Sequence, residues 1–390
     1  MISFDTSLRL LADLATALPS ETVALDDADG RVLATPIIAM RNSPPFTVSA
    51  MDGYGVRDDD LSLPCSLAVV GKSFAGGSLP PPLVPRSCMR VFTGAPVPAG
   101  ADRIIVQEDV ESDDKHALFS KPLSDRRHIR VAGSDFGTGD ILIDAGWALT
   151  PQSLVTVAAA GMAQVNAVRQ PKVAILATGD ELAGPGQSQN GSVPDSLSAA
   201  LAAMTRRWHG LVVDRHVLPD DRAQLRHAAE QALERADVVI VTGGASVGEK
   251  DFAKEMFANL AIVFSKVAIR PGKPVWLGTV GKTVILGLPG NPTSAVVTAR
   301  LYLAPLLLGL AGHKAETAWN WQTMSVDVPL EAAGDRDTFL CAKSTDSGVV
   351  PLRQQDSAAQ RSLANTEFLI HRRANAPSML GGAAAKVIPL

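Results

Sequence analysis

Residues 171–181, PKVAILATGDE, decide the fold of the largest part of the chain. The proline is followed by an apolar run from Lys172 to Ala177 and then by a polar turn, a pattern typical of a buried strand that ends in a loop. Strand and helix patterns alternate from there to about residue 303. We expect further strands at 211–217, 237–241 and 283–287, and helices at 196–208, 221–235, 252–260 and 292–303.

This alternation predicts an α/β domain. Strands that alternate with helices imply parallel pairing, with helices on both faces of the sheet. Ligands of such sheets bind beyond the carboxyl ends of the strands. The loops at 178–181, 242–248 and 288–292 each follow a predicted strand, so we expect the functional site there.

The flanking regions have other patterns. Residues 5–18 place leucines on one helical face and predict an N-terminal helix. From Arg41 to about Ala132, short apolar runs are split by proline and glycine clusters, which indicates a β-rich segment. Residues 318–390 again suggest short strands with turns, and we expect a small separate β domain there.

The composition disfavours several classes of protein. A chain of 390 residues is expected to form two or more domains. Its net charge of -4 and its 5% of aromatic residues argue against a nucleic-acid partner. The most apolar stretch, Leu301 to Ala311, is too short to span a bilayer, so no membrane partner is expected. The odd, widely spaced cysteines Cys65, Cys88 and Cys341 are typical of reduced thiols in the cytoplasm.

The glycine-rich loop at 243–248 has several interpretations. Its backbone N–H groups can turn inward to bind an anion, with Ser246 as a further donor, but a plain glycine-rich turn is equally consistent. The loop also matches G-x-S-x-G, the nucleophile elbow of serine hydrolases. An elbow enters its helix at once, however, whereas here residues 248–251 intervene. A phosphate-binding P-loop ending at Gly281-Lys282-Thr283 is disfavoured, because Trp276 stands where its first glycine must be.

Acidic residues recur at the predicted strand ends, at Glu181, Asp220 and Asp251. Converging carboxylates suit Mg²⁺, which takes one or two of them together with substrate phosphate oxygens. For Asp220 and its neighbour Asp221, capping of the following helix is an alternative. The seven histidines show no metal-ligand spacing, so zinc is not expected.

Cations follow at Lys266 and in Arg270-Pro271-Gly272-Lys273-Pro274. Cations held by a Pro/Gly turn suit a tetrahedral oxyanion or a phosphate. A solvated loop is the alternative interpretation of this run.

Six segments, read together and in order, resemble the molybdopterin molybdenumtransferase family, whose eukaryotic relatives include the E domain of gephyrin. They are SPPFTVSAMDGY at 43–54, TGAPVPAGAD at 93–102, TGDEL at 178–182, GGASVG at 243–248 with Asp251, RPGKP at 270–274 and GLPGNP at 287–292. The match extends over nearly the whole chain.

The resemblance implies a multidomain α/β protein and a head-to-tail homodimer. Domain I would be discontinuous (1–40 and 133–165), with the β-rich domain II inserted at 41–132. Domain III (166–314) would be a MogA-like, molybdopterin-binding α/β domain with a parallel-rich sheet, and domain IV (318–390) a C-terminal β-barrel. In the family the active cleft lies between subunits, so Asp52 and Thr93 would serve a site built mainly by the partner.

The family's reaction, insertion of molybdate into adenylyl-molybdopterin with release of AMP, assigns roles by resemblance. Catalytic roles fall to Asp52, Thr93, Glu181, Asp220 and Asp251, with Asp220 and Asp251 as ligands of the Mg²⁺ cofactor. Substrate- and cofactor-binding roles fall to Arg130, Asp135, Asp195, Gly243, Gly244, Ser246, Lys266, Arg270, Lys273, Pro289, Gly290, Asn291 and Pro292. Molybdopterin adenylyltransferase and molybdoenzyme chaperones are the candidate partners, in the cytoplasm.

Three positions depart from the family pattern. Leu197 replaces an asparagine, Cys341 an arginine, and Arg361 the first of two serines. Because Leu197 lacks the amide, we expect weaker substrate binding, which an asparagine at 197 would restore by roughly 2 to 12-fold. A weakened paralogue that acts as a molybdopterin-binding scaffold or carrier is one alternative function. Adenylylation of molybdopterin is another, but it is associated with single-domain relatives, and the extra domains argue against it.

Overall fold

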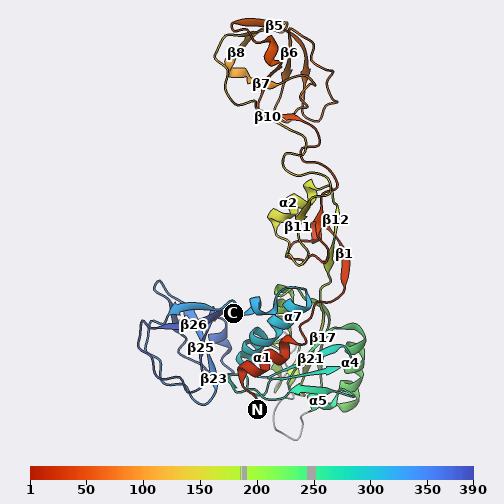
Figure 1. Cartoon of the computed structure of the whole chain (residues 1–390). Coiled ribbons are helices and arrows are strands. Elements are labelled where there is room, and N and C mark those ends of the chain that lie inside the picture. The colour runs from red at the N-terminus through yellow and green to blue at the C-terminus, as the bar shows by residue number, and fades with distance from the viewer. Residues whose placement is uncertain (185, 187–190, 244–251) are drawn as a thin grey trace. The chain divides into compact units, whose positions relative to one another are not determined.

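The computed structural model describes residues 1–184, 186, 191–243 and 252–390, drawn as ribbon in Figure 1. The chain forms two compact units, each described here by itself. Unit 1 comprises residues 1–21, 30–34 and 167–390, and unit 2 comprises residues 22–29 and 35–166. This division is coarser than the four predicted domains, whose boundaries stay a prediction.

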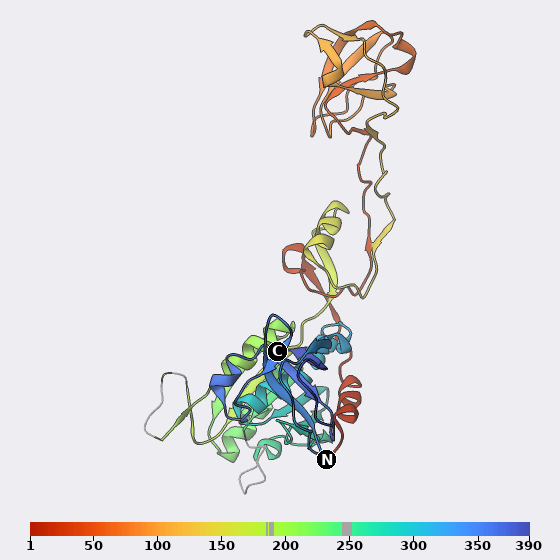
Figure 2. The same ribbon diagram turned by 90° about the vertical axis from the view of Figure 1, so that its left-hand side faces the viewer.

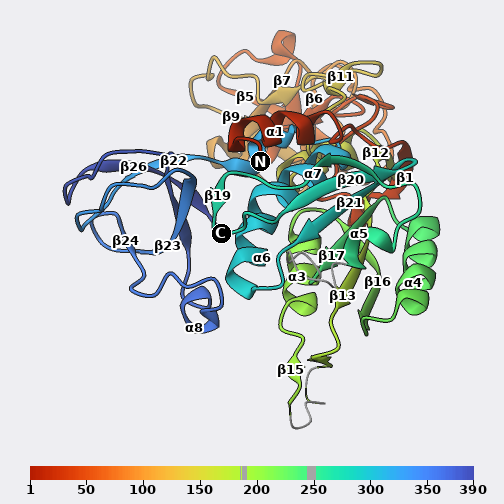
Figure 3. The ribbon, with the colours of Figure 1, turned by 90° about the horizontal axis from the view of Figure 1, so that it is seen from below.

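The centre of unit 1 is a six-stranded sheet in the order β16-β13-β17-β21-β20-β18. Its strands are β13 (Lys172–Thr178), β16 (Leu211–Leu218), β17 (Val238–Thr242), β18 (Ala261–Phe264), β20 (Trp276–Val280) and β21 (Thr283–Leu288). The four strands expected from the sequence, β13, β16, β17 and β21, pair in parallel. The two strands that were not expected, β20 and β18, extend the sheet with antiparallel pairing (Figure 3). The predicted α/β class is confirmed.

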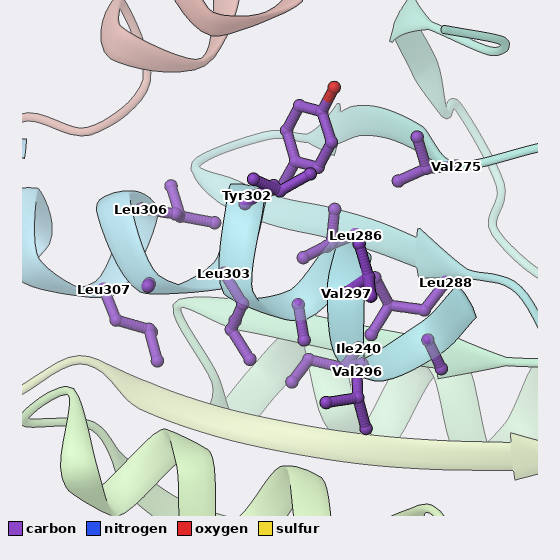
Figure 4. Packing of buried hydrophobic residues seen from close by; sticks show 14 of the residues in the cluster. Ile240, Val275, Leu286, Leu288, Val296, Val297, Tyr302, Leu303, Leu306 and Leu307 are labelled. Carbon is purple, nitrogen blue, oxygen red and sulfur yellow. The ribbon is translucent and has the colours of Figure 1, made fainter. Parts of the chain in front are cut away.

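Both faces of this sheet are buried, as the predicted helices on both sides require. On β13, Val173 and Ile175 join one hydrophobic cluster, and Ala174 and Leu176 join the other. The first cluster includes α1 (Phe4–Ala12), α3 (Ser198–Arg207), α6 (Pro292–Thr298) and α7 (Ala304–Leu310); the second includes α4 (Arg222–Arg235) and α5 (Phe252–Glu255). Figure 4 shows Tyr302, Leu303 and Leu306 packed above the sheet. This two-sided burial is the main source of hydrophobic stabilisation in unit 1.

The helix expected at 292–303 is longer than predicted. A π-helical turn, Ala299–Leu303, joins α6 to α7, so the helix continues to Leu310. Within the described residues, this 19-residue helix, Pro292–Leu310, is the one long and apolar enough to cross a membrane, and 94% of its most apolar window is buried inside the protein. Its apolar composition is accounted for by its place in the core. The N-terminal helix, by contrast, is shorter than the predicted 5–18, because α1 ends at Ala12.

The C-terminal segment forms a second sheet in unit 1, as expected for residues 318–390. Its strands are β22 (Gln322–Ser325), β23 (Asp337–Ser344), β24 (Val349–Pro351), β25 (Phe368–Arg372) and β26 (Ala384–Pro389), and a short helix, α8 (Gln360–Leu363), precedes β25 (Figures 1 and 2). The strand β19 (Ile269–Arg270) pairs with the start of β23, with Arg270 opposite Thr338. The cationic loop at 270–274 is therefore attached directly to the C-terminal sheet.

Unit 2 is built mainly from strands. Its six-stranded sheet has the order β7-β4-β6-β5-β9-β8. The strands are β4 (Gly53–Val56), β5 (Cys65–Ser73), β6 (Ser87–Val91), β7 (Arg103–Val106), β8 (Val110–Ser112) and β9 (His116–Phe119), with a further pair of β3 (Val48–Ser49) and β10 (Ile129–Arg130). The segment 41–132, expected to be β-rich, contains all of these strands. The rest of the unit includes β2 (Ile37–Ile38) paired with β11 (Ile141–Ile143), and α2 (Pro151–Ala159).

Candidate functional site

The loops that follow β13, β17 and β21 meet at the carboxyl edge of the α/β sheet. Gly243 has a φ of +88°, and a Cβ at this position would lie 2.2 Å from the carbonyl oxygen of Thr178. A Cβ on Gly290 would lie 3.6 Å from the Cα of Gly243. Only glycine allows the backbone at 243 to come this close in this conformation. The sequence prediction that these three loops lie together is thus matched by their backbone contacts.

The acidic residues Glu181 and Asp220 lie on adjoining loops at this edge. The carboxylate of Glu181 lies over Gly179, where a Cβ would be 2.7 Å from one of its oxygens. The carboxylate of Asp180 accepts a hydrogen bond from the backbone N–H of Asp220 at 2.9 Å. This bond ties the loop after β13 to the loop after β16. Asp251, Gly244 and Ser246, which the sequence assigned to the same site, lie outside the described residues.

The capping alternative applies to Asp221 and not to Asp220. Asp221 is the N-cap of α4, and its carboxylate accepts a hydrogen bond from the N–H of Gln224 at 2.8 Å. The ligand role of Asp220 stays a prediction.

The donor chemistry of this edge fits Mg²⁺. No group of three or more His, Cys, Asp or Glu side chains that could hold a metal occurs within residues 1–184, 186, 191–243 and 252–390. Mg²⁺ does not require such a group, because it is held by one or two carboxylates and completes its shell with water and substrate phosphate. The described carboxylates at this edge, those of Asp180, Glu181 and Asp220, are oxygen donors of the kind that Mg²⁺ prefers.

The cationic loop at 270–274 lines a cavity of about 560 Å³ between the α/β sheet region and the C-terminal sheet of unit 1. Its polar lining includes Arg270, Lys273, Ser294, Arg336, Ser357 and Arg372, with Glu331 and Asp356 as the acids. The four basic groups outnumber the two acids, so the lining favours an anion. Lys266, which we expected beside Arg270, is exposed and is not among the lining residues.

Arg372 is the most buried of the basic residues that line the cavity. It is only 7% exposed, and its Nη2 donates to the carbonyl of Pro377. Its Nη1 is fully buried and has no hydrogen-bond partner among the described residues. A buried guanidinium N–H without an acceptor is costly unless a ligand supplies one. The sequence analysis missed Arg372; its one signal was a charged residue at the end of an apolar strand.

The segment Pro289-Gly290-Asn291-Pro292 connects β21 to α6 and to the cavity wall. Asn291 does not cap α6 with its side chain; instead its amide donates to the hydroxyl of Ser357 at 3.1 Å. The N–H of Thr293 donates to the carbonyl of Ser357 at 3.0 Å. Asn291 thus holds the C-terminal segment against the start of α6.

In unit 2, Asp52 and Thr93 are in direct contact. The carboxylate of Asp52 accepts hydrogen bonds from the hydroxyl and the N–H of Thr93, both at 2.7 Å. These two hydrogen bonds hold the pKa of Asp52 below its usual value of 3.8, and the bond from the hydroxyl has the larger effect. The stabilisation from these hydrogen bonds is therefore fully present above pH 3.8. It is lost as the pH falls through the lower pKa that Asp52 has in the folded protein. Asp52 is a carboxylate at neutral pH.

Arg130 and Asp135 do not form an ion pair within the described part of the chain. Arg130 is exposed on β10 opposite Val48, and the N–H of Asp135 donates to the carbonyl of Ser43 at 2.9 Å. Both side chains are exposed to solvent.

The segment Asp195-Ser196-Leu197 has a structural role. The buried carboxylate of Asp195 accepts hydrogen bonds from the N–H groups of Leu197 and Ser198 at the start of α3. The side chain of Leu197 is only 7% exposed and belongs to the hydrophobic core with Val173. The expectation that the missing amide at 197 weakens substrate binding is not supported, because the side chain of Leu197 packs into the core.

The other two departures also lie away from the cavity lining. Cys341 is buried in β23, where its backbone N–H and carbonyl both bond to the side chain of Gln355. Arg361 is exposed on α8. Arg336 and Arg372 supply the positive charge that the C-terminal segment gives to the cavity.

Unit 1 thus has a carboxyl edge with acids and glycines, and a cavity whose lining is mainly basic and favours an anion. Two family models match the chain: the MoeA N-terminal region (domain I and II) over residues 2–161, and the probable molybdopterin binding domain over residues 174–309.

Known proteins resemble most of the chain. A molybdopterin molybdenumtransferase of Haemophilus influenzae is 40% identical over 309 residues, which cover 78% of this chain and 76% of the relative. One from Synechococcus elongatus is 32% identical over 381 residues, 93% of each chain. The crystal structure of a molybdopterin biosynthesis protein from Pyrococcus horikosii has 27% identity and a TM-score of 0.86, and the match covers 100% of this chain and 99% of that one.

The chain belongs to the molybdopterin molybdenumtransferase family. The resemblance inferred from the six sequence segments is confirmed, as is the assignment to the transferases.

The burial of Leu197 generates a prediction about stability. Leu197→Asn should lower the free energy of unfolding by about 2 kcal/mol or more, because it removes core packing and buries an amide. Denaturant titration measures this change. Leu197→Met, which conserves volume, should cost less than about 1.5 kcal/mol. An asparagine variant as stable as the unaltered chain would show that position 197 is not part of the core.

Proposed function

We propose that this chain inserts molybdate into adenylyl-molybdopterin and releases AMP, as the last step of molybdenum cofactor synthesis in the cytoplasm. Its family membership supports the reaction class. The observation that carries the proposal is the charge of the cavity lining, where Arg270, Lys273, Arg336 and Arg372 stand against two acids. Such a cavity suits a tetrahedral oxyanion or a phosphate group.

The cations of the cavity would bind and orient the anionic substrates. Arg270 and Lys273 are exposed and can meet an incoming oxyanion, whereas Arg372 lies deeper and supplies a fixed donor. In the reaction, the phosphoanhydride bond between the adenylyl group and the pterin phosphate breaks and AMP leaves. Water supplies the oxygen for this cleavage, and the two dithiolene thiols bind the molybdenum of molybdate, displacing one of its oxygens as water.

The acids at the carboxyl edge would serve the departing phosphate. Asp220 and Asp251 would hold Mg²⁺, with Glu181 as a supporting acid. When bound, Mg²⁺ neutralises charge on the phosphate oxygens of the leaving AMP. The Asp180 bond to the N–H of Asp220 orients this loop, and the bonds from Thr93 keep Asp52 ionised.

We also propose that the chain is a homodimer that exchanges substrates with molybdopterin adenylyltransferase and with molybdoenzyme chaperones. The family resemblance supports a shared site, because in the family the active cleft lies between two subunits. Analytical ultracentrifugation should give about twice the 40.8 kDa of one chain. A mass of one chain at working concentrations would contradict the dimer.

The reaction is tested by AMP release from adenylyl-molybdopterin in the presence of molybdate and Mg²⁺. Asp220→Asn should lower the rate at limiting Mg²⁺ by at least about 10-fold, because a metal ligand is lost while the backbone bond to Asp180 remains. Asp221→Asn is the matched control: it removes the same charge one residue away and keeps a good helix cap. Its rate should stay within about twofold of the unaltered chain. No AMP release by the unaltered chain would refute the proposed function, and equal rates for the two variants would refute the role of Asp220.

A further inference from the structure

Two phenylalanine rings in unit 2 stack at the surface next to Thr93. The ring centroids of Phe74 and Phe92 are 4.7 Å apart, and their planes differ by 11°. Phe74 directly follows β5 and Phe92 directly follows β6, and these strands pair in parallel with Ser73 opposite Val91 (Figure 1). The N–H of Phe92 donates to the carbonyl of Ser73 at 3.2 Å. The strand register therefore fixes the two rings against each other.

A cation also lies against these rings. The guanidinium of Arg90 lies 4.9 Å from the ring centroid of Phe92 and 5.0 Å from that of Tyr54. Arg90 is itself held by hydrogen bonds to the carbonyl of Gly53 and to the side chain of Gln107. We call Phe74, Phe92, Arg90 and Tyr54 the aromatic stack. Phe92 is partly buried, whereas Phe74 is the exposed ring of the pair.

The outer surface of Phe74 is open. Its side chain is 54% exposed, and a Cβ on the nearby Gly76 would meet no atom within 4 Å. The Cβ of Ala75 lies 3.7 Å from the Cβ position of Gly94, the residue after Thr93. Phe74 thus presents an unoccupied ring beside the loop that carries the Asp52 and Thr93 contact.

Local packing alone does not account for this arrangement. A single exposed apolar side chain is common on protein surfaces and needs no explanation. Here, however, the exposed ring is parallel to a second ring, backed by a fixed cation, and next to a candidate catalytic pair. Aromatic rings presented in this way are typical of sites that bind the flat face of a nitrogen heterocycle.

We propose that Phe74 stacks against the fused heteroaromatic ring of the substrate, either its pterin or its adenine, and so is a specificity residue of the reaction. This inference rests on the proposed function, because adenylyl-molybdopterin carries both rings. Both heterocycles have an extended π face, so the same contact can serve either one. The aromatic stack would position the substrate relative to Asp52 and Thr93 without taking part in bond breaking.

The test is the dissociation constant of the full chain for adenylyl-molybdopterin, with and without the Phe74 ring. Phe74→Leu should weaken binding by about fivefold or more, because it keeps apolar surface but removes the stacking face. Phe74→Tyr keeps a flat ring and should stay within about twofold. Trp147→Leu is the matched control, since Trp147 is 57% exposed in the same unit and makes none of the ring contacts found among the described residues. It should bind like the unaltered chain.

Competition experiments identify the ring. If Phe74 binds adenine, AMP should compete less well in Phe74→Leu while neopterin is unaffected; the opposite result assigns the pterin. Equal affinity of Phe74→Leu and the unaltered chain would overturn the proposal. An equal loss of affinity in Phe74→Leu and Trp147→Leu would also overturn it. So would a Phe74→Leu variant that binds normally but changes its mass in solution, because the ring would then contact another copy of the chain.

The outcome for the aromatic stack is distinguishable from that for the proposed function. If Phe74→Leu weakens binding but neither the unaltered chain nor any variant releases AMP, the binding role of Phe74 is supported and the proposed reaction is refuted. If AMP is released with the same kcat and KM in Phe74→Leu, Trp147→Leu and the unaltered chain, the reaction stands and the stack is not a substrate site. A rise in KM at unchanged kcat in Phe74→Leu supports both.

Discussion

The contact between Gly243 and the carbonyl of Thr178 is the constraint on which the candidate site depends. A side chain at 243 would place its Cβ 2.2 Å from that oxygen, so only glycine lets the chain leave β17 this close to the end of β13. Gly290 then approaches Gly243 from the loop after β21. Because parallel strands end at the same edge, this close backbone approach brings three separate segments of the chain into one place. The Asp180 bond to the N–H of Asp220 adds a fourth.

Most buried side chains of unit 1 are apolar and stabilise the fold, whereas a few are charged. The alternating residues of β13 fill two apolar cores, and Leu197 and Cys341 belong to the first of them. Arg372 differs, because its buried Nη1 has no acceptor in the part of the chain that the structure describes. An unpaired buried donor lowers stability, and such a cost is typical of groups kept for a ligand. The cavity that Arg372 lines has four basic groups against two acids, a charge balance that favours an anion.

Sequence reasoning predicted the elements whose patterns are local and missed features that depend on tertiary contacts. The strand at 172–177 was predictable because an apolar run and a polar turn mark it. The antiparallel strands β18 and β20 were missed, since short apolar runs carry no sign of their pairing. The helix from Pro292 passes Pro305 because a π-helical turn precedes that proline, which no sequence pattern shows. Position 197 was misjudged because family resemblance gives an alignment but not the direction of a side chain.

The central claim, that closure of the loops at the carboxyl edge creates the catalytic site, is tested most directly by AMP release from Gly243→Ala. The control is Gly281→Ala, at the opposite end of β21, where φ is also positive but a Cβ would meet nothing within 4 Å. We predict that Gly243→Ala loses AMP release by about 100-fold or more, since a shift of about 1 Å in the loops suffices for that. Gly281→Ala should lose only about 1 kcal/mol of stability and keep its rate. A Gly243→Ala variant that releases AMP as fast as the control would contradict the account.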